Sequence, residues 1–222
     1  MAQALDDLLD SLEDADDATR EEAAKALAEL ANPATLDALI GACGDEFWSV
    51  RTRAGWGVAK IGGPKAIEAL IVLFNDPIME VRNEAVAAVV SLGAGQLDRL
   101  LAAMKDERWR VREHAAKACG DLHDSRAVDA LTFACRDRDG AVKSAAAEAL
   151  GKIGDPKAIP ALVKLFRDSS KIVRETAGIA LVAIGQPSVD LLLETLKDKD
   201  FVVRCHAARA LGGMTTDYQI GR

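Results

Sequence analysis

The sequence is short of aromatic residues, of histidine and of long apolar runs, and each shortage argues against a class of protein. Aromatic residues form 4% of the 222 residues, and histidine occurs three times. A di-iron centre needs several converging histidine and carboxylate ligands, and only His114 has a neighbouring glutamate. No apolar run approaches the roughly 18–20 residues that cross a bilayer, so we expect no membrane span. We expect neither a metal nor another cofactor.

The four cysteines lack the spacing of a metal or redox site. None of them forms a C-x-x-C pair. Cys43, Cys119 and Cys135 occupy apolar positions of helical stripes, which predicts buried thiols in a reducing compartment. The first residues contain no basic stretch followed by an apolar one, so we expect no secretory signal and a cytoplasmic location.

What the sequence does contain is a repeat in which an aspartate precedes a basic residue by six positions. The seven pairs are Asp14/Arg20, Asp45/Arg51, Asp76/Arg82, Asp106/Arg112, Asp137/Lys143, Asp168/Arg174 and Asp198/Arg204. The basic residues step along the chain by 31, 31, 30, 31, 31 and 30 residues. A fixed period in this range is typical of a solenoid, in which stacked units bury a shared core.

Each repeat reads as two helices. The first carries apolar residues at i, i+3, i+4 and i+7, as in Leu36, Leu39, Ile40 and Cys43. The second begins near the basic residue, with alanine three positions later and alanine or glycine six positions later in every copy. The pattern predicts an all-α solenoid of about seven helix pairs in a single domain. The predicted repeats are residues 1–31, 32–62, 63–93, 94–123, 124–154, 155–185 and 186–214, and we expect residues 215–222 to form a cap or a tail.

Glycine marks the turn after four of the second helices. Gly62, Gly93, Gly154 and Gly185 stand where a left-handed residue usually ends a helix. His123 takes the place of glycine in the fourth repeat. Because histidine adopts the left-handed region at some cost, we predict a weaker turn there, and not a metal ligand.

The acid–base pairs predict a structural ladder between repeats. The aspartate lies in the turn between paired helices, where its carboxylate accepts backbone N–H groups. The forked guanidinium of arginine reaches the aspartate or the turn carbonyls of a neighbouring repeat. All fourteen residues of the pairs are assigned to this ladder, and its regularity argues against catalysis because an active site needs one place unlike the others.

Lys143 lacks the forked donors of the six arginines. We therefore predict a looser junction at this repeat. Amide hydrogen exchange measured by mass spectrometry is expected to be faster over residues 137–146 than over the matching segments of the adjacent repeats. Equal protection in all of these segments would contradict the prediction.

Several stretches resemble a known repeat class. Residues 154–162, Gly-Asp-Pro-Lys-Ala-Ile-Pro-Ala-Leu, and 76–82, Asp-Pro-Ile-Met-Glu-Val-Arg, resemble the HEAT-like repeats of the phycobilin-lyase type. A Val-Arg-x-x-Ala-Ala core recurs at 111–116 and, with one change, at 203–208. The resemblance covers residues 3–214 and implies a right-handed α-solenoid whose second helices line the concave side. The same class serves chromophore lyases, antenna-degradation adaptors and scaffolds.

One side of the second helices is expected to bind a partner. The positions one, two, five and nine residues after the basic residue stay polar or variable, and stacking joins them into a strip. The predicted partner-binding residues are Arg53, Trp56, Lys60, Glu84, His114, Lys117, Glu148, Ile179, His206 and Arg209.

Tryptophan is unusual within this strip. At the position of Trp56 the other copies carry lysine, alanine, glutamate, isoleucine or arginine. We therefore predict an exposed Trp56, flanked by two basic residues, that anchors an interface. Trp48, Trp109 and Phe201 share a position at the start of the second helix, and for them we predict packing at the turn.

Charge is concentrated at one end of the chain. Residues 1–30 hold ten acidic and two basic residues, a net charge of −8, and since the whole chain carries −7 the remainder carries +1. An acidic end repeat keeps a solenoid terminus soluble. The other interpretation is a docking site for a basic partner.

These observations leave three functions open. The first is a non-catalytic scaffold or adaptor that binds a protein partner on the preformed concave face. The alternative is a phycobilin lyase subunit or a related phycobiliprotein-handling protein, with Arg53 and Arg209 for the pigment propionates and Trp56 and His114 beside its ring system. A HEAT-like DNA-binding protein or glycosylase fits less well, because a phosphate-binding face must be basic. No catalytic motif interrupts the repeats, so the scaffold is ranked first and an enzymatic role, if there is one, is that of a bilin lyase.

Overall fold

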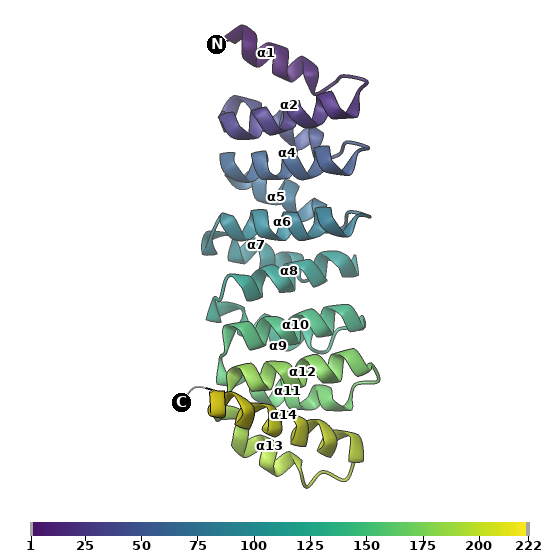
Figure 1. The fold of residues 1–222 in the computed structure, drawn as a ribbon, viewed down its shortest axis with the longest axis vertical. Helices are drawn as coiled ribbons and strands as arrows, with labels where there is room; N and C mark the ends of the chain where they lie inside the picture. The colour runs from purple at the N-terminus through teal and green to yellow at the C-terminus, as the bar shows by residue number, and fades with distance from the viewer. Residues whose placement is uncertain (1, 221–222) are drawn as a thin grey trace. The chain divides into compact units, whose positions relative to one another are not determined.

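The computed structural model describes residues 2–220, with side chains over residues 3–214, and all regular structure in this range is helical. Figure 1 shows the helices stacked in pairs. The chain divides into two units, Met1–Arg99 and Leu100–Arg222. Unit 1 contains α1 (Ala2–Ser11), α2 (Asp17–Leu30), α3 (Leu36–Ala42), α4 (Trp48–Ile61), α5 (Pro64–Leu73) and α6 (Met79–Ser91). The boundary between the units falls within α7 (Leu97–Ala103). Unit 2 contains α8 (Trp109–Asp121), α9 (Val128–Ala134), α10 (Gly140–Ile153), α11 (Ile159–Lys164), α12 (Lys171–Ile184), α13 (Val189–Thr195) and α14 (Phe201–Ile220).

The helices of each unit form two layers. In unit 1 the second helices pack in chain order, α2 on α4 and α4 on α6, with α3 and α5 behind them. In unit 2 the order is α8, α10, α12 and α14, with α9, α11 and α13 in the other layer. The predicted all-α solenoid of about seven helix pairs is confirmed. Residues 215–220, predicted as a cap or tail, continue α14 as helix, and residues 221–222 lie outside the described range.

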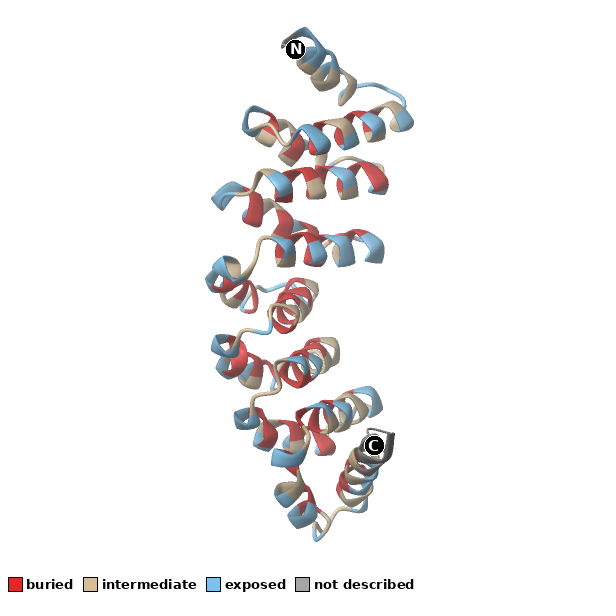
Figure 2. Ribbon diagram, turned by 60° about the vertical axis from the view of Figure 1, so that its left-hand side comes forward, coloured by how far each residue is buried: buried red, intermediate tan, exposed pale blue. Residues whose placement is uncertain are grey.

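The core depends on very close contacts between second helices. Figure 2 shows buried residues along the sides on which neighbouring helices meet. A Cβ placed on Gly120 of α8 would lie 2.6 Å from the Cα of Ala149 on α10. A Cβ on Gly151 would lie 2.8 Å from the Cα of Ala180 on α12. The small residues recognised in the repeat pattern therefore let neighbouring backbones touch.

The turns follow the predicted backbone conformations. Gly62, Gly93, Gly154 and Gly185 have φ between 75° and 78°. His123 has φ of 51°, which confirms the left-handed turn that its position predicts. Its Nδ1 lies 2.9 Å from the carbonyl oxygen of Lys152, so the ring is held against α10.

Acid–base pairs join the repeats within each unit. Arg51 donates from Nε and Nη2 to the two oxygens of Asp76, at 2.6 and 2.9 Å, and from Nη1 to the carbonyl oxygens of Asp45 and Glu46. The aspartate also accepts the N–H of Ile78 at 2.8 Å. Arg20 with Asp45 and Arg112 with Asp137 repeat this arrangement, and Lys143 pairs with Asp168.

Arg82 is the last ladder arginine of unit 1. Its Nη1 donates to the carbonyl oxygens of Asp76 and Pro77, at 2.7 and 3.1 Å, as the other ladder arginines do in their own turns. Its Nε, which in Arg51 binds the next aspartate, is buried without a hydrogen-bond partner among the described residues. The expected acceptor, Asp106, follows Arg82 by 24 residues, lies in unit 2 and binds Arg108 within that unit. The pairing of Arg82 with Asp106 therefore stays a prediction.

The first aspartate and the last arginine of the predicted ladder have local partners. Asp14 accepts the N–H of Asp16 at 2.8 Å. Arg204 donates from Nη1 to the carbonyl oxygens of Asp198 and Lys199, at 2.7 and 3.0 Å. These residues therefore fix their own turns, since no repeat of the described chain precedes the first or follows the last.

The ladder carboxylates are held in their charged form. Burial raises the pKa of Asp45, but hydrogen bonds from Arg20 and the N–H of Phe47 outweigh it and bring the pKa below its ordinary value. The pKa of Asp137 is lowered in the same way by Arg112 against the opposing effect of burial. These pairs therefore remain ionic at neutral pH and hold adjacent turns together.

No single helix within residues 2–220 is long and apolar enough to cross a membrane. Two pairs of sharply bent helices, Met79–Ser91 with Ala94–Ala103 and Lys171–Ile184 with Gln186–Thr195, reach that length and apolar content only together.

Candidate binding surface

The predicted anchor in unit 1 is tied to its neighbours. Trp56 on α4 is half-buried, and its Nε1 donates to Glu84 of α6 at 2.9 Å. Arg53 lies 3.4 Å from Glu21 of α2, and Lys60 is exposed. Trp56 is therefore half-buried where the sequence predicts an exposed side chain, because a carboxylate of the next repeat binds the indole N–H. Four predicted binding residues, Arg53, Trp56, Lys60 and Glu84, nevertheless lie on α4 and α6.

In unit 2 the structure removes one residue from the predicted strip. His114 is 1% exposed, and its Nδ1 lies 2.7 Å from the carbonyl oxygen of Arg110. It is a core residue and does not reach the surface, which corrects the sequence-based assignment. Lys117 pairs with Glu113 one turn earlier on α8. Glu148 is exposed on α10.

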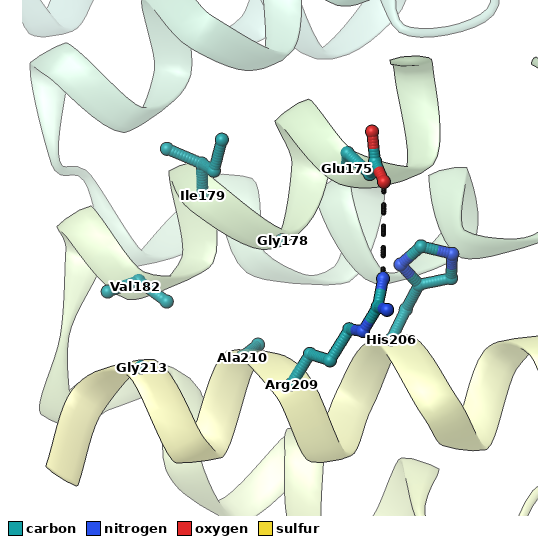
Figure 3. Close-up of a pocket in the computed structure, with 8 residues that line it drawn as sticks. All are labelled: Glu175, Gly178, Ile179, Val182, His206, Arg209, Ala210 and Gly213. Atoms are coloured by element: carbon teal, nitrogen blue, oxygen red, sulfur yellow. Dashed lines mark ion pairs between the residues drawn. The ribbon is translucent and has the colours of Figure 1, made fainter. Parts of the chain in front are cut away.

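The other three predicted residues meet at a groove between α12 and α14. Ile179 comes from α12, and His206 and Arg209 come from α14 (Figure 3). The groove has a volume of about 550 Å³, and its lining residues are Glu175, Gly178, Ile179, Val182, His206, Arg209, Ala210 and Gly213. Figure 3 shows Glu175, His206 and Arg209 gathered at one end and Val182 and Gly213 at the other. This groove has an apolar wall and one polar end.

The groove opens where a small residue is replaced. Val182 stands eight residues after Arg174, the position that Gly120 and Gly151 occupy in the two preceding repeats. Those glycines lie against the next helix, whereas here the larger side chain of Val182 stands between α12 and α14. A Cβ placed on Gly213 would lie 3.2 Å from Cγ2 of Val182.

The ladder is also altered at this junction. Arg174 donates from Nε to Nε2 of His206 at 3.3 Å, and Asp198 pairs with Arg167 instead. The predicted ladder pair of Arg174 with Asp198 is therefore absent. Each pair that forms within a unit joins residues 25 positions apart, whereas Asp198 follows Arg174 by 24.

The step of 30 residues between Arg174 and Arg204 identifies this junction in the sequence. The other 30-residue step within the array runs from Arg82 to Arg112 and contains the boundary between the two units. Within unit 2, the shortened step thus coincides with an arginine that lacks its predicted aspartate.

His206 is neutral and held in one orientation. Its ring stacks on Phe166, with centroids 5.5 Å apart, and is 8% exposed. Burial lowers the pKa of His206, and the neighbouring Arg174 and Arg209 lower it further, against the smaller opposing effect of Glu175. Because arginine only donates, Nε2 is the acceptor and the proton of the neutral ring is on Nδ1.

A second hollow lies on the same side of unit 2. It has a volume of about 430 Å³ and lies among α8, α10 and the start of α12. It brings the predicted Lys117 and Glu148 together with Ser144 and the exposed Ile172. Unlike the α12–α14 groove, it is lined mainly by small and charged residues.

The aromatic residues at the helix starts are less buried than predicted. Trp48, Trp109 and Phe201 all remain exposed, so packing at the turn does not describe them. Arg110 lies over the ring of Trp109, with its guanidinium carbon 4.7 Å from the centroid.

Metal chemistry has no evident location among the described residues. No group of three histidine, cysteine or acidic side chains within that range is placed to hold an ion. Burial raises the pKa of Cys43, Cys119 and Cys135 to about 12, so these thiols are unreactive at neutral pH.

Stacked helix pairs with small residues at their contacts define a class of repeat solenoid, and comparison identifies the family. A model of HEAT repeats matches residues 5–90, 97–182 and 164–220. The chain belongs to the HEAT-repeat family. None of the curated proteins compared with the chain matches it.

Solved structures give the same fold. The chain is 25% identical to a chain of the complex of CpcE and CpcF of phycocyanin lyase from Nostoc sp. PCC7120, covering 66% of this chain and 98% of that chain, with a TM-score of 0.55. Yeast importin-beta (Kap95p) is 16% identical over 96% of this chain and 35% of its own, with a TM-score of 0.64. The second likeness concerns the fold alone.

Proposed function

We propose that this protein is a non-catalytic scaffold that binds a segment of a protein partner in the groove between α12 and α14. The observation that carries the proposal is the juxtaposition of an exposed apolar side chain, a preformed groove and a polar end. Ile179 is 70% exposed on the groove wall, Glu175 lies one helical turn earlier on α12, and Arg209 lines the groove from α14. An apolar anchor beside an arginine is the composition of interface hot spots.

The shape of the groove favours recognition over chemistry. Among the described residues that line it, none is a nucleophile activated by a base, and His206 is engaged through Nε2 by Arg174. The walls are two long helices fixed by the core, so little of the site has to be ordered on binding. The solved lyase structure is itself a complex of two different chains, which supports a protein as the partner.

A second candidate is the handling of a bilin or a phycobiliprotein. The support for it is the likeness to the CpcE–CpcF lyase complex, over nearly the whole of the matched chain. Arg209 would take a propionate of the pigment, with Ile179 against the ring system. Co-expression with a phycobiliprotein and its bilin tests this candidate, because a coloured adduct formed only in the presence of this chain would favour it over a passive scaffold.

Site-specific photo-crosslinking tests the scaffold. We replace Ile179 with p-benzoylphenylalanine in the native host and place the same group at Phe133 as the matched control. Phe133 is 76% exposed, so the two positions differ in location and not in accessibility. We expect one reproducible protein adduct from position 179 and none from position 133, identified by mass spectrometry.

The proposal is wrong if the two positions yield the same set of weak adducts. An adduct obtained only from position 133 would move the binding surface to the first-helix layer. Competition by excess unlabelled protein separates a specific partner from chance encounters.

A further inference from the structure

We infer that the α12–α14 groove takes an acidic amphipathic helix of the partner, with a carboxylate against Arg209 and His206 and an apolar side chain one turn away against Ile179. This inference rests on the proposed function and adds the chemistry of the partner. It follows from the spacing, the charges and the available donors of the groove.

The two ends of the groove are one helical turn apart on both walls. Glu175 and Ile179 are four residues apart on α12, and Arg209 and Gly213 are four residues apart on α14. Four residues advance a helix by about 6 Å. A partner helix lying along the groove therefore meets both ends with side chains three or four positions apart.

The polar end has more positive than negative charge. Lys171 and Arg209 both approach Oε1 of Glu175, at 3.6 and 4.0 Å. Arg174 adds a third cation, and over the described part of the chain it pairs with no carboxylate. At the corresponding position of the preceding repeats, Arg112 and Lys143 are each neutralised by an aspartate. The carboxylate of Asp168 also acts on Arg174, but it pairs with Lys143. Glu175 is therefore the one carboxylate that lines the groove beside these cations, and a further negative charge is favoured there.

The polar end also offers donors that suit a carboxylate. Nε2 of His206 accepts from Arg174, so the ring proton is on Nδ1. No described side chain is an acceptor for this Nδ1–H. The side chain of Arg209 is 73% exposed, and its guanidinium lies 4.0 Å from Glu175, at the limit of an ion pair. A carboxylate of the partner is therefore able to form a shorter ion pair with Arg209, and only the weak contact with Glu175 is lost.

The apolar end receives an uncharged side chain. Ile179 and Val182 form the wall on α12, and Ala210 and Gly213 form the floor on α14. A leucine or isoleucine of the partner would pack against this apolar surface. A basic helix meets the same apolar wall but places its cations beside Arg174 and Arg209, which repel them.

Two synthetic peptides test this selectivity with the full chain. Both have about 18 residues and leucine at i, i+3, i+4 and i+7, with glutamate on the polar face of one and lysine on that of the other. Fluorescence anisotropy of the labelled peptides gives the two dissociation constants at low and at physiological salt. We expect the acidic peptide to bind at least about tenfold more tightly, with a difference that shrinks as salt rises.

Charge reversal locates the binding. Arg209→Glu is expected to weaken the acidic peptide by about tenfold or more, because it removes the exposed donor and adds a repelling carboxylate. Lys157→Glu is the matched control: it makes the same charge change at an exposed lysine of the turn before α11, and we expect less than a twofold effect. Circular dichroism of both variants checks that the helices are retained.

Three results would overturn the inference. They are tighter binding of the basic peptide, equal binding of both peptides, and equal losses in Arg209→Glu and Lys157→Glu. The crosslinking experiment then separates the two proposals: an adduct at position 179 with no preference for the acidic peptide retains the scaffold and removes the acidic partner. An acidic preference that Arg209→Glu abolishes, without an adduct at position 179, retains the acidic site and removes the proposed cellular partner.

Discussion

Asp76→Ala is expected to lower the free energy of unfolding of unit 1 by about 3–5 kcal/mol. The side chains of Arg51 and Asp76 are 10% and 5% exposed, so the pair is shielded from solvent. Removing the carboxylate leaves the guanidinium of Arg51 buried with only the carbonyl oxygens of Asp45 and Glu46 as partners. It also removes the acceptor for the N–H of Ile78 in the turn before α6. The lower stability therefore reflects both an uncompensated buried charge and a lost hydrogen bond in the turn.

Urea unfolding followed by circular dichroism measures this effect, with hydrogen exchange to locate it. Asp37→Ala is the matched control, because Asp37 pairs with Lys65 at 2.9 Å in the same unit but both side chains are more than two-thirds exposed. We expect that control to cost less than about 1 kcal/mol. Exchange is expected to rise in α4 and α6 and to stay unchanged in unit 2, since repeats contact only their neighbours.

Equal effects of the two substitutions would show that burial does not govern the strength of the ladder. Replacing both partners, with Arg51→Met and Asp76→Leu, tests the mechanism further. The double variant is expected to recover most of the stability, because no charge is then left without a partner.

The features that repeat were predictable from the sequence. Asp45, Asp76 and Asp137 form the expected ladder because identical residues at a fixed spacing must occupy equivalent places in stacked units. The left-handed turn at His123 was predictable for the same reason, since four other copies carry glycine there. Periodicity gives each position a structural meaning without any knowledge of the contacts.

The features that differ between repeats were not predictable from residue types alone. His114 and His206 share a repeat position and were both assigned to the surface, yet both are buried. Trp56 was taken as exposed because its equivalents are mostly polar, and the Glu84 carboxylate that holds its indole comes from the next repeat. Arg174 was assigned to the ladder by residue type, although after the one-residue shortening Asp198 pairs with Arg167. For Trp56 and Arg174 the outcome depends on residues of the next repeat, so only the packed structure determines it.

Two departures from the repeat pattern mark the groove in the sequence, but their meaning is clear only from the structure. Val182 departs from the glycine of the two preceding copies, and the step from Arg174 to Arg204 is one residue short. Both departures fall at one junction, where an opened helix contact and a broken ladder pair occur together. In a periodic protein, the places where the period fails are the candidates for a function of their own.

Gly120→Ala is expected to destabilise unit 2 by about 2–3 kcal/mol, although alanine is the better helix former. The added Cβ would lie 2.6 Å from the Cα and 2.7 Å from the Cβ of Ala149. Because backbone and not a flexible side chain opposes it, no rotamer change relieves the contact, and α8 and α10 must separate along their length. The separation loses dispersion contacts over the whole interface.

Gly178→Ala separates the steric effect from helix propensity. A Cβ on Gly178 of α12 would lie 3.8 Å from Cε1 of Phe166, an ordinary contact, so the same change is expected to stabilise unit 2 by about 0.5–1 kcal/mol. Urea midpoints of the two variants, measured side by side, are therefore expected to shift in opposite directions. Shifts of the same sign would mean that α8 and α10 move apart at little cost. The separation of α12 and α14 would then not require a large side chain between them, and the groove could not be attributed to Val182.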